Sequence, residues 1–280
     1  MHSRELNKVR GDRQLEINTP AHLKQEHAKG NRRQPSAITE ATTPVEENHT
    51  HPQYRIDRKD MELLRLTDEV ILKDREAWVD QGTLLGLVRD GKLIEWDNDI
   101  DLSIMYQKRP HLRLRDARRL LDMGYILLTS RFGITVKPIS DDKKIKKVDL
   151  TYVYPKNGRY LKSYSDFEHQ NLLAKIFEKT IKELLGLVQR TGRSSIRLLF
   201  WLMANGISWW YRSFFMKTID MECPQWQFDL DKTVLMEELN SIYIYRRPEQ
   251  YLVHKYGEDW RVPKKDWDYT SQDGGVIPRD

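Results

Sequence analysis

Carboxylates alternate with apolar residues in one short stretch of this 280-residue chain, and this alternation constrains the fold more than any other feature. From Asp99 the order is Asp, Ile, Asp, Leu, Ser, Ile, and a strand separates such a period-two pattern into an apolar face and an acidic face. Asp99 and Asp101 therefore project together, about 6.5 to 7 Å apart along the strand. Two carboxylates held side by side repel, so this face requires either a Lys or Arg partner or a divalent metal ion.

The residues before the acidic strand predict a phosphate-binding turn. A short apolar run at residues 77–79 leads to Gly82 and Thr83, and residues 84–88 follow with the composition of a helix. Glycine permits close approach to the backbone, and a helix N-terminus favours anions. A strand, a Gly-Thr turn, a short helix and an acidic strand, in this order, are typical of a nucleotide-phosphate site.

The order of these residues resembles the signature of a known family. The family is that of the LicD/fukutin-related phosphotransferases. Its pattern resembles the run Gly82-Thr83-Leu84-Leu85-Gly86 with Arg89, followed by Ile94, Trp96, Asp97, Asp99, Ile100 and Asp101. The run from Pro248 to Trp260 looks like the closing motif of that family, so the resemblance covers about residues 60 to 265 and is sparse between 160 and 240. It implies an α+β fold of the polymerase-beta-like nucleotidyltransferase type: a mixed β-sheet flanked by helices, with a helical insertion and a small C-terminal element.

The resemblance also implies a reaction. Members of the family transfer a phospho-alcohol group, such as phosphocholine or a polyol phosphate, from a CDP-activated donor to a hydroxyl of a cell-surface glycan, teichoic acid, lipopolysaccharide or glycolipid. The implied cofactor is Mg²⁺ or Mn²⁺, with Asp99, Asp101 and Asp149 as catalytic residues and metal ligands and Asp97 as a further candidate ligand. The implied substrate-binding residues are Gly82, Thr83, Gly86 and Arg89, with Arg89 as a bidentate donor to the diphosphate.

Two interpretations of Asp149 remain open from the residues alone. In its β-branched and aromatic strand, it is either an edge-strand charge paired with Lys146 or Lys147, or the third carboxylate of the Asp99 and Asp101 site. The order of elements favours the second interpretation, because polymerase-beta-like enzymes supply such a residue after an intervening helix and strands.

A second function uses the same carboxylates. A nucleotidyltransferase that adds NMP to a small molecule or an RNA end would need the same pattern, and released CMP rather than pyrophosphate would separate the two. The intact set of Asp99, Asp101 and Asp149 argues against a binding protein on a decayed enzyme scaffold. Asn98 stands where many family members have a further Asp, and the cysteine-rich zinc element of the animal enzymes is missing, which favours a microbial-type member.

Composition sets broad limits on partners and compartment. Lys and Arg number 47 against 42 Asp and Glu, a mild excess that suits a polyanionic substrate, a phosphate-rich membrane surface or nucleic acid and does not choose among them. For the reaction that the resemblance implies, no nucleic-acid partner is expected. Cys223 is the single cysteine, which excludes an intrachain disulfide and a cysteine zinc cluster. The first thirty residues contain no apolar run typical of a secretory signal, so the expected location is cytoplasmic, with peripheral contact at the inner face of the membrane as a further expectation.

Changes in composition divide the chain into four predicted parts. They are a disordered polar tail (1–56), the catalytic core (57–165), a helical segment facing a membrane or the acceptor (166–223), and a C-terminal part that completes the core (224–280). Within the core, Asp60 is the expected N-cap of a first helix, and a second helix is expected from Arg109-Pro110 to Gly124. Strands are expected at residues 125–130, 134–139 and 145–154, followed by a turn at 155–158. A strand at 242–245 and a helix from Pro248 to Gly257 are expected near the end.

Large aromatic residues mark the helical segment. Between Arg197 and Arg212 the apolar part is too short to span a bilayer, and two interpretations remain open: a core helix that covers the sheet, or a helix lying in a membrane interface. We predict that residues 198–211 lie against the membrane or the lipid-linked acceptor, with Trp201, Trp209 and Trp210 on one face.

Overall fold

The computed structural model describes eight stretches of the chain, all within the unit Thr50–Asp280. These are residues 54–73, 75–106, 114–140, 145–166, 172–214, 217–228, 232–236 and 238–277. The predicted disordered tail lies outside the described residues except for residues 54–56. The backbone N–H of Arg55 donates to the carbonyl of Gly91 at 2.8 Å, so the ordered body begins before the predicted boundary at residue 56.

The first helix begins before its predicted start. α1 covers Arg58–Thr67 and continues as a π-helical turn, η1 (Asp68–Leu72). Asp57 is the N-cap residue, whereas Asp60, the predicted N-cap, is buried inside the first turn. The Asp60 carboxylate accepts a hydrogen bond from the backbone N–H of Lys146 at 3.1 Å, so it joins the helix to the sheet instead of capping it.

The predicted order of strand, helix and strand is confirmed, but the helix begins at Gln81, so Gly82 and Thr83 lie in its first turn and not in a turn before it. β1 (Ala77–Val79) leads to α2 (Gln81–Asp90), and β2 (Asp99–Met105) follows. Asp80 is the N-cap of α2, and its carboxylate accepts the N–H of Gln81. Gly91, at φ 68°, ends the helix in the left-handed conformation that glycine adopts without steric cost.

The middle of the chain follows the predicted order of helix and strands. α3 covers Leu114–Asp122, and the predicted start of this helix near Pro110 lies outside the described residues. β3 (Tyr125–Thr129), β4 (Gly133–Pro138) and β5 (Lys147–Lys156) confirm the three predicted strands. β5 turns directly into β6 (Arg159–Asp166) through Asn157 and Gly158, both at positive φ, as a two-residue hairpin turn requires.

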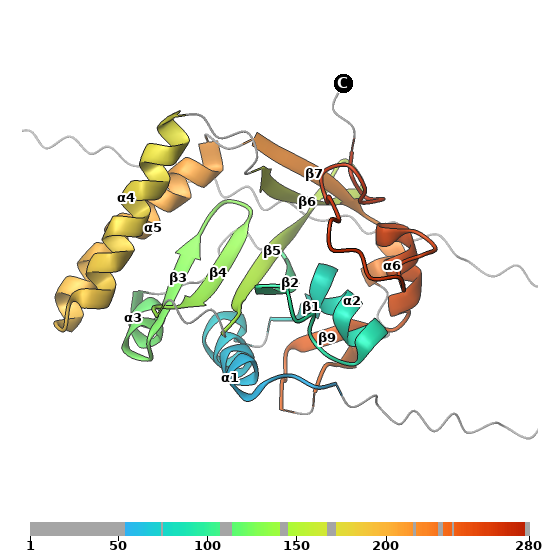
Figure 1. The fold of residues 1–280 in the computed structure, drawn as a ribbon, viewed down its shortest axis with the longest axis horizontal. Helices are drawn as coiled ribbons and strands as arrows, with labels where there is room; N and C mark the ends of the chain where they lie inside the picture. The colour runs from blue at the N-terminus through green and yellow to red at the C-terminus, as the bar shows by residue number, and fades with distance from the viewer. Residues whose placement is uncertain are drawn as a thin grey trace, which may run out of the picture. The chain divides into compact units, whose positions relative to one another are not determined.

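A single nine-stranded mixed sheet contains all these strands (Figure 1). Its main order is β3-β4-β5-β2-β1-β9-β8, and β6 and β7 extend it from the far end of β5. β2 pairs with β5 in parallel and β1 pairs with β9 in parallel, whereas the other described pairs are antiparallel. The expected α+β class, a mixed sheet flanked by helices, is therefore confirmed.

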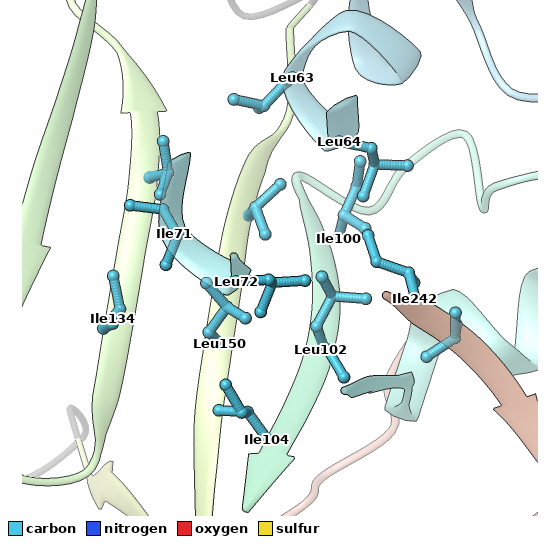
Figure 2. Packing of buried hydrophobic residues seen from close by; sticks show 14 of the residues in the cluster. Leu63, Leu64, Ile71, Leu72, Ile100, Leu102, Ile104, Ile134, Leu150 and Ile242 are labelled. Atoms are coloured by element: carbon cyan, nitrogen blue, oxygen red, sulfur yellow. The ribbon is translucent and has the colours of Figure 1, made fainter. Parts of the chain in front are cut away.

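One face of the sheet is packed by α1 and η1 (Figure 2). Leu63, Leu64, Ile71 and Leu72 are fully buried against the apolar side chains of β2, β4, β5 and β9, among them Ile100, Leu102, Ile104, Ile134, Leu150 and Ile242. Since side chains alternate along a strand, the residues between these point to the opposite face. The packing of the even-numbered residues of β2 therefore directs Asp99 and Asp101 away from the core.

The predicted helical segment is a helical hairpin followed by a strand. α4 (Leu172–Arg190) and α5 (Ser194–Phe214) run side by side and contact β3 and α3 through α5 (Figure 1). Residues 217–223, predicted as helical, form β7 (Lys217–Cys223), which pairs with β6 over its whole length. The prediction was wrong there although Ile219, Met221 and Cys223 alternate with polar residues, a period of two that is typical of a strand.

The three tryptophans of α5 do not share one face, in contrast to the prediction. Trp201 is buried and 3% exposed, and its indole N–H donates to the carbonyl of Leu127 at 2.6 Å. Trp209 and Trp210 are 40% and 45% exposed. At about 100° per residue Trp210 lies opposite Trp201, so α5 packs on the sheet with one side and exposes tryptophan on the other. Among the described residues, no helix has both the length and the hydropathy that crossing a bilayer demands.

The C-terminal part returns to the sheet and to α2. After η2 (Gln225–Phe228) and β8 (Lys232–Val234), β9 (Ile242–Tyr245) pairs with β1, and α6 (Pro248–Tyr256) packs against α2. The predicted strand at 242–245 and the helix from Pro248 are confirmed, including the end of the helix at Gly257, where φ is 85°.

Candidate active site

The parallel pairing of β2 and β5 brings three carboxylates together. Asp101 lies in register with Asp149, and Asp99 with Lys147, so all four side chains project from the same face of two adjacent strands. Asp97, just before β2, completes the group: Asp97, Asp99 and Asp101 each offer a carboxylate oxygen, and these oxygens lie within 4.8 Å of one another. This all-oxygen donor set fits a hard divalent cation such as Mg²⁺ or Mn²⁺.

α2 holds the acidic strand from the side. The backbone N–H of Asp101 donates to the hydroxyl of Thr83 at 2.8 Å, and the N–H of Asp80 donates to the carbonyl of Asp101 at 3.0 Å. Gly82 lies so close to Asp97 that a Cβ on it would stand 2.5 Å from the Asp97 carboxylate oxygen. Gly82 is therefore required for the approach of the helix N-terminus to the carboxylates.

Lys147 is an internal counter-ion of this site. Its ammonium lies 2.8 Å from Asp99 Oδ2 and also contacts Asp149 Oδ2. Thr135 on β4 donates to the other oxygen of Asp149 at 2.6 Å. Asp149 thus joins the site and also has Lys147 as its partner. The interpretation of Asp149 as an edge-strand charge is wrong, because β5 lies between β4 and β2 inside the sheet.

The carboxylates have different proton affinities. Burial, together with the hydrogen bond and charge of Asp99, raises the pKa of Asp97 to about 7. Burial acts in the same direction on Asp101, and with the charges of Asp99, Asp149 and Asp97 it raises the pKa of Asp101 well above its usual range. Burial opposes ionisation of Asp99 as well, but the hydrogen bond from Asp97 and the Lys147 ammonium hold the pKa of Asp99 below its usual value. The site is therefore poised to lose protons when a cation binds.

A buried ionic network supports the N-terminus of α2. The Asp80 carboxylate is fully buried and accepts hydrogen bonds from the Lys162 ammonium and from the hydroxyls of Ser103 and Tyr251. Burial would favour the neutral acid, but the Lys162 and Lys255 ammonium groups hold the pKa of Asp80 well below its usual range. Since these partners come from β2, β6 and α6, the network ties three parts of the chain to the helix that carries Gly82 and Thr83.

Two adjoining cavities open at the carboxylates. The first, which we call the acidic cleft, has a volume of about 710 Å³ and is walled by the acidic strands, by β4 and by C-terminal aromatic residues. The second, the aromatic cleft, has about 240 Å³ and is lined by Trp96, Trp260 and Trp267 with Arg89, Lys264 and Lys265. Gly82, Asp97, Tyr256 and Trp267 line both cavities, so the two lie next to each other.

The predicted substrate-binding residues occupy three different situations. Gly82 lines both cavities. Thr83 is buried against Asp101, and Gly86 packs against the 92–94 backbone, where a Cβ would lie 2.7 Å from the Lys92 carbonyl. Arg89 lines the aromatic cleft, and its guanidinium forms a bidentate pair with the neighbouring Asp90 carboxylate, at 2.9 and 2.7 Å. Thr83 and Gly86 thus position the backbone, because both are buried against other parts of the protein.

Sequence reasoning missed several residues of the site. Lys147 was considered only as a partner that would make Asp149 structural, and Lys162, 82 residues from Asp80, carried no local signal. Asp80 could have been found, because an Asp directly before a predicted helix is a typical N-cap. The aromatic cleft could have been suspected from the tryptophans of the C-terminal part, although their meeting with Trp96 depends on the fold.

Comparisons with known proteins agree with this geometry. Residues 74–188 match the family described as "LicD/FKTN/FKRP, nucleotidyltransferase domain". The uncharacterized protein RP689 of Rickettsia prowazekii is 36% identical over 108 residues, which are 36% of this chain and 40% of that protein. The uncharacterized protein RT0683 of Rickettsia typhi is 35% identical over 66 residues, 22% of this chain and 21% of that protein. The match thus spans about two fifths of the first relative and one fifth of the second.

One solved structure is also similar in part. The solution structure of the antibiotic-resistance factor ANT(2'')-Ia aligns with 52% of this chain and 83% of its own, at 12% sequence identity and a TM-score of 0.24.

Proposed function

Residues 74–188 belong to the LicD/FKTN/FKRP nucleotidyltransferase family, and from this premise we propose that the protein is a metal-dependent transferase of substituted phosphate groups. The donor in this proposal is a CDP-activated alcohol, and the acceptor is a hydroxyl of a glycan or lipid-linked glycan. The observation that carries the proposal is that Asp99, Asp101 and Asp149 project from the same face of two adjacent parallel strands, with Asp101 in register with Asp149, and face a cleft of about 710 Å³.

The donor set favours divalent-cation chemistry. A bound Mg²⁺ or Mn²⁺ would neutralise charge on the diphosphate and lower the pKa of an attacking hydroxyl. Asp97, Asp99 and Asp101 would hold it, because their oxygens already lie within 4.8 Å of one another. Their like charges oppose ionisation of one another in the metal-free protein, so cation binding is coupled to deprotonation of Asp97 and Asp101.

Asp149 is assigned to the acceptor hydroxyl. Thr135 occupies one carboxylate oxygen, which orients the other oxygen toward Lys147 and the cleft. In the proposed step, the hydroxyl oxygen forms a bond to the phosphorus that bears the alcohol, and its proton passes to Asp149. The bond from that phosphorus to the bridging oxygen breaks, and CMP leaves with the bridging oxygen.

The aromatic cleft is assigned to the nucleoside of the donor. Tryptophan rings provide surfaces on which a pyrimidine can stack, and stacking accepts any base. Arg89, Lys264 and Lys265 add positive charge to the same cavity, and the Lys265 ammonium lies 5.2 Å from the Trp96 ring centre. A nucleoside there would place its diphosphate beside Gly82 and Asp97, which line both cavities.

A donor panel tests the proposal. The full chain with Mn²⁺ or Mg²⁺ is incubated with CDP-choline, CDP-ribitol and CDP-glycerol and with CTP and ATP, in the presence of a glycan that offers free hydroxyl groups as acceptors. Thermal stabilisation and released CMP or pyrophosphate are measured. We expect one CDP-alcohol to stabilise the protein and to yield CMP in the wild type and in Asp122→Asn, a control at an exposed carboxylate of α3, but not in Asp99→Asn. Pyrophosphate release from a nucleoside triphosphate would instead establish a nucleotidyltransferase, and equal CMP release by Asp99→Asn would refute the assigned site.

A further inference from the structure

The α4–α5 hairpin concentrates the exposed apolar side chains of the described part of the chain. Eight of the fourteen large apolar residues that are exposed there lie on these two helices: Ile176, Leu187, Leu199, Leu202, Met203, Trp209, Trp210 and Phe214. Single exposed apolar residues are common on any protein, but a concentration of this kind marks an interaction surface.

The exposed side of α5 carries no charge. Over α5, which the structure describes from end to end, the exposed residues are Ser195, Leu199, Leu202, Met203, Gly206, Trp209, Trp210 and Phe214. At 3.6 residues per turn they fall within an arc of about 140°. The opposite side, with Trp201 and Ala204, is buried on the sheet. A helix that packs with one apolar side and exposes a second one has a surface unsuited to bulk water.

The exposed aromatic rings are braced by neighbours. Trp210 makes an edge contact with Phe177 of α4 at 5.5 Å between ring centres, and Trp209 makes one with Phe214 at 5.7 Å. Because these contacts already restrict the rings, the rings lose less conformational entropy when they bind another surface.

Positive charge lies beside this apolar surface, on α4 and on the turn after it. The exposed charged residues of α4 and of the turn after it are five bases and one acid among the described side chains: Lys175, Lys179, Lys182, Arg190 and Arg193 against Glu183. The exposed apolar side of α5, which we call the apolar strip, contains tryptophan and is bordered by Lys and Arg. Such a strip is complementary to the interface of a bilayer that contains anionic lipid.

We propose that the α4–α5 hairpin docks the protein on the surface of an anionic membrane. α5 lies in the plane of the interface with Leu199, Met203 and Trp210 in the acyl boundary, and the bases of α4 contact the headgroups. The inference concerns the exposed side of the hairpin and stands independently of the proposed reaction.

Vesicle binding tests the inference. The full chain is mixed with vesicles of phosphatidylcholine alone or with added phosphatidylglycerol, and bound protein is measured by flotation. We expect binding only with phosphatidylglycerol, weakened by salt, and reduced about tenfold or more by the double variant Trp209→Ser and Trp210→Ser. Trp226→Ser is the matched control, because Trp226 is also 40% exposed but lies on η2, and it should bind like the wild type. Lys175→Glu with Lys179→Glu should also release the protein.

Three results would overturn the inference. The first is absence of vesicle binding by the wild type, and the second is equal binding to vesicles of phosphatidylcholine alone. The third is a wild-type dimer in sedimentation that becomes a monomer in the double variant, with no binding of either protein to vesicles. The last result would assign the strip to a second copy of the chain. If the double variant is unstable, quenching of wild-type tryptophan fluorescence by brominated lipid decides the question, because only a ring in the acyl region is quenched.

Discussion

Replacing Asp101 by Asn should stabilise the metal-free protein while removing its response to metal. Asp101 lies at the bottom of the acidic cleft, where burial and the charges of Asp99, Asp149 and Asp97 disfavour its ionised form. The unfolded chain has no such constraint, so the folded state is weakened wherever the pH would ionise a free carboxyl group. Asparagine keeps the shape of the side chain and removes the charge.

The magnitude follows from the spacing of the carboxylates. Two unit charges at the 4.8 Å limit of this cluster repel by about 3 kcal/mol at an effective dielectric constant near 20. Protonation of Asp101 relieves part of this repulsion, so we expect a gain on the order of 1 to 3 kcal/mol at pH 8. For a body of this size, that gain corresponds to a rise in Tm of roughly 2 to 10 °C. Because the pKa of Asp101 is raised, the gain should shrink as the pH is lowered toward the usual pKa of a free Asp, about 4.

Asp99→Asn is the matched comparison. It removes an equal charge two residues away, but it also deprives Lys147 of a partner at 2.8 Å. We expect no comparable stabilisation in this variant, since an ion pair is lost together with the repulsion. In both variants, the rise in Tm that Mn²⁺ gives the wild type should disappear.

Calorimetry in EDTA and in Mn²⁺, at pH 5 and pH 8, tests this reasoning. A metal-free Asp101→Asn protein that melts clearly below the wild type at pH 8 would contradict the assigned repulsion. Retention of the full wild-type response to Mn²⁺ by either variant would contradict the metal site.

Three further outcomes are expected. The metal-free wild type should lose stability as the pH rises from about 4 to 7, because the pKa of Asp97 is raised to about 7 and the folded state binds the extra proton only below that pH. Asp97→Asn should flatten this part of a plot of Tm against pH. An unchanged plot would contradict the raised pKa. Asp80→Ala should lower the free energy of unfolding in urea by about 3 to 5 kcal/mol, because it leaves the buried Lys162 ammonium without its carboxylate; partial recovery by Lys162→Met is the control. Trp201→Ala should lower the free energy of unfolding by about 3 to 5 kcal/mol, whereas Trp209→Ser should change it by less than about 1 kcal/mol. Similar effects of the two substitutions would contradict the packing of α5 with one side buried and the other exposed.

Local patterns determined most of the catalytic half of the fold. The alternation at Asp99 and Asp101 predicted both the strand and the face on which the carboxylates lie, because the side-chain period of a strand depends on neighbouring residues only. The helix after Asp80 and the two-residue turn at Asn157 and Gly158 were readable for the same reason. Residues 217–223 were misassigned although Ile219, Met221 and Cys223 alternate with polar residues; the local pattern indicates a strand, and only its partner, β6, lies more than 50 positions away.

The electrostatics of the site were decided by the tertiary structure. Lys147 reaches Asp99 across 48 positions of sequence, and Lys162 reaches Asp80 across 82. No local period encodes such meetings, which arise where β2 and β6 are brought beside β5. The sequence by itself therefore determined which residues carry the acidic chemistry. Only the tertiary structure decided which lysines pair with the carboxylates. It also decided that Thr83 and Gly86 support the backbone and that α5 has one buried and one exposed apolar side. These features depend on which side of a helix or strand the rest of the chain covers.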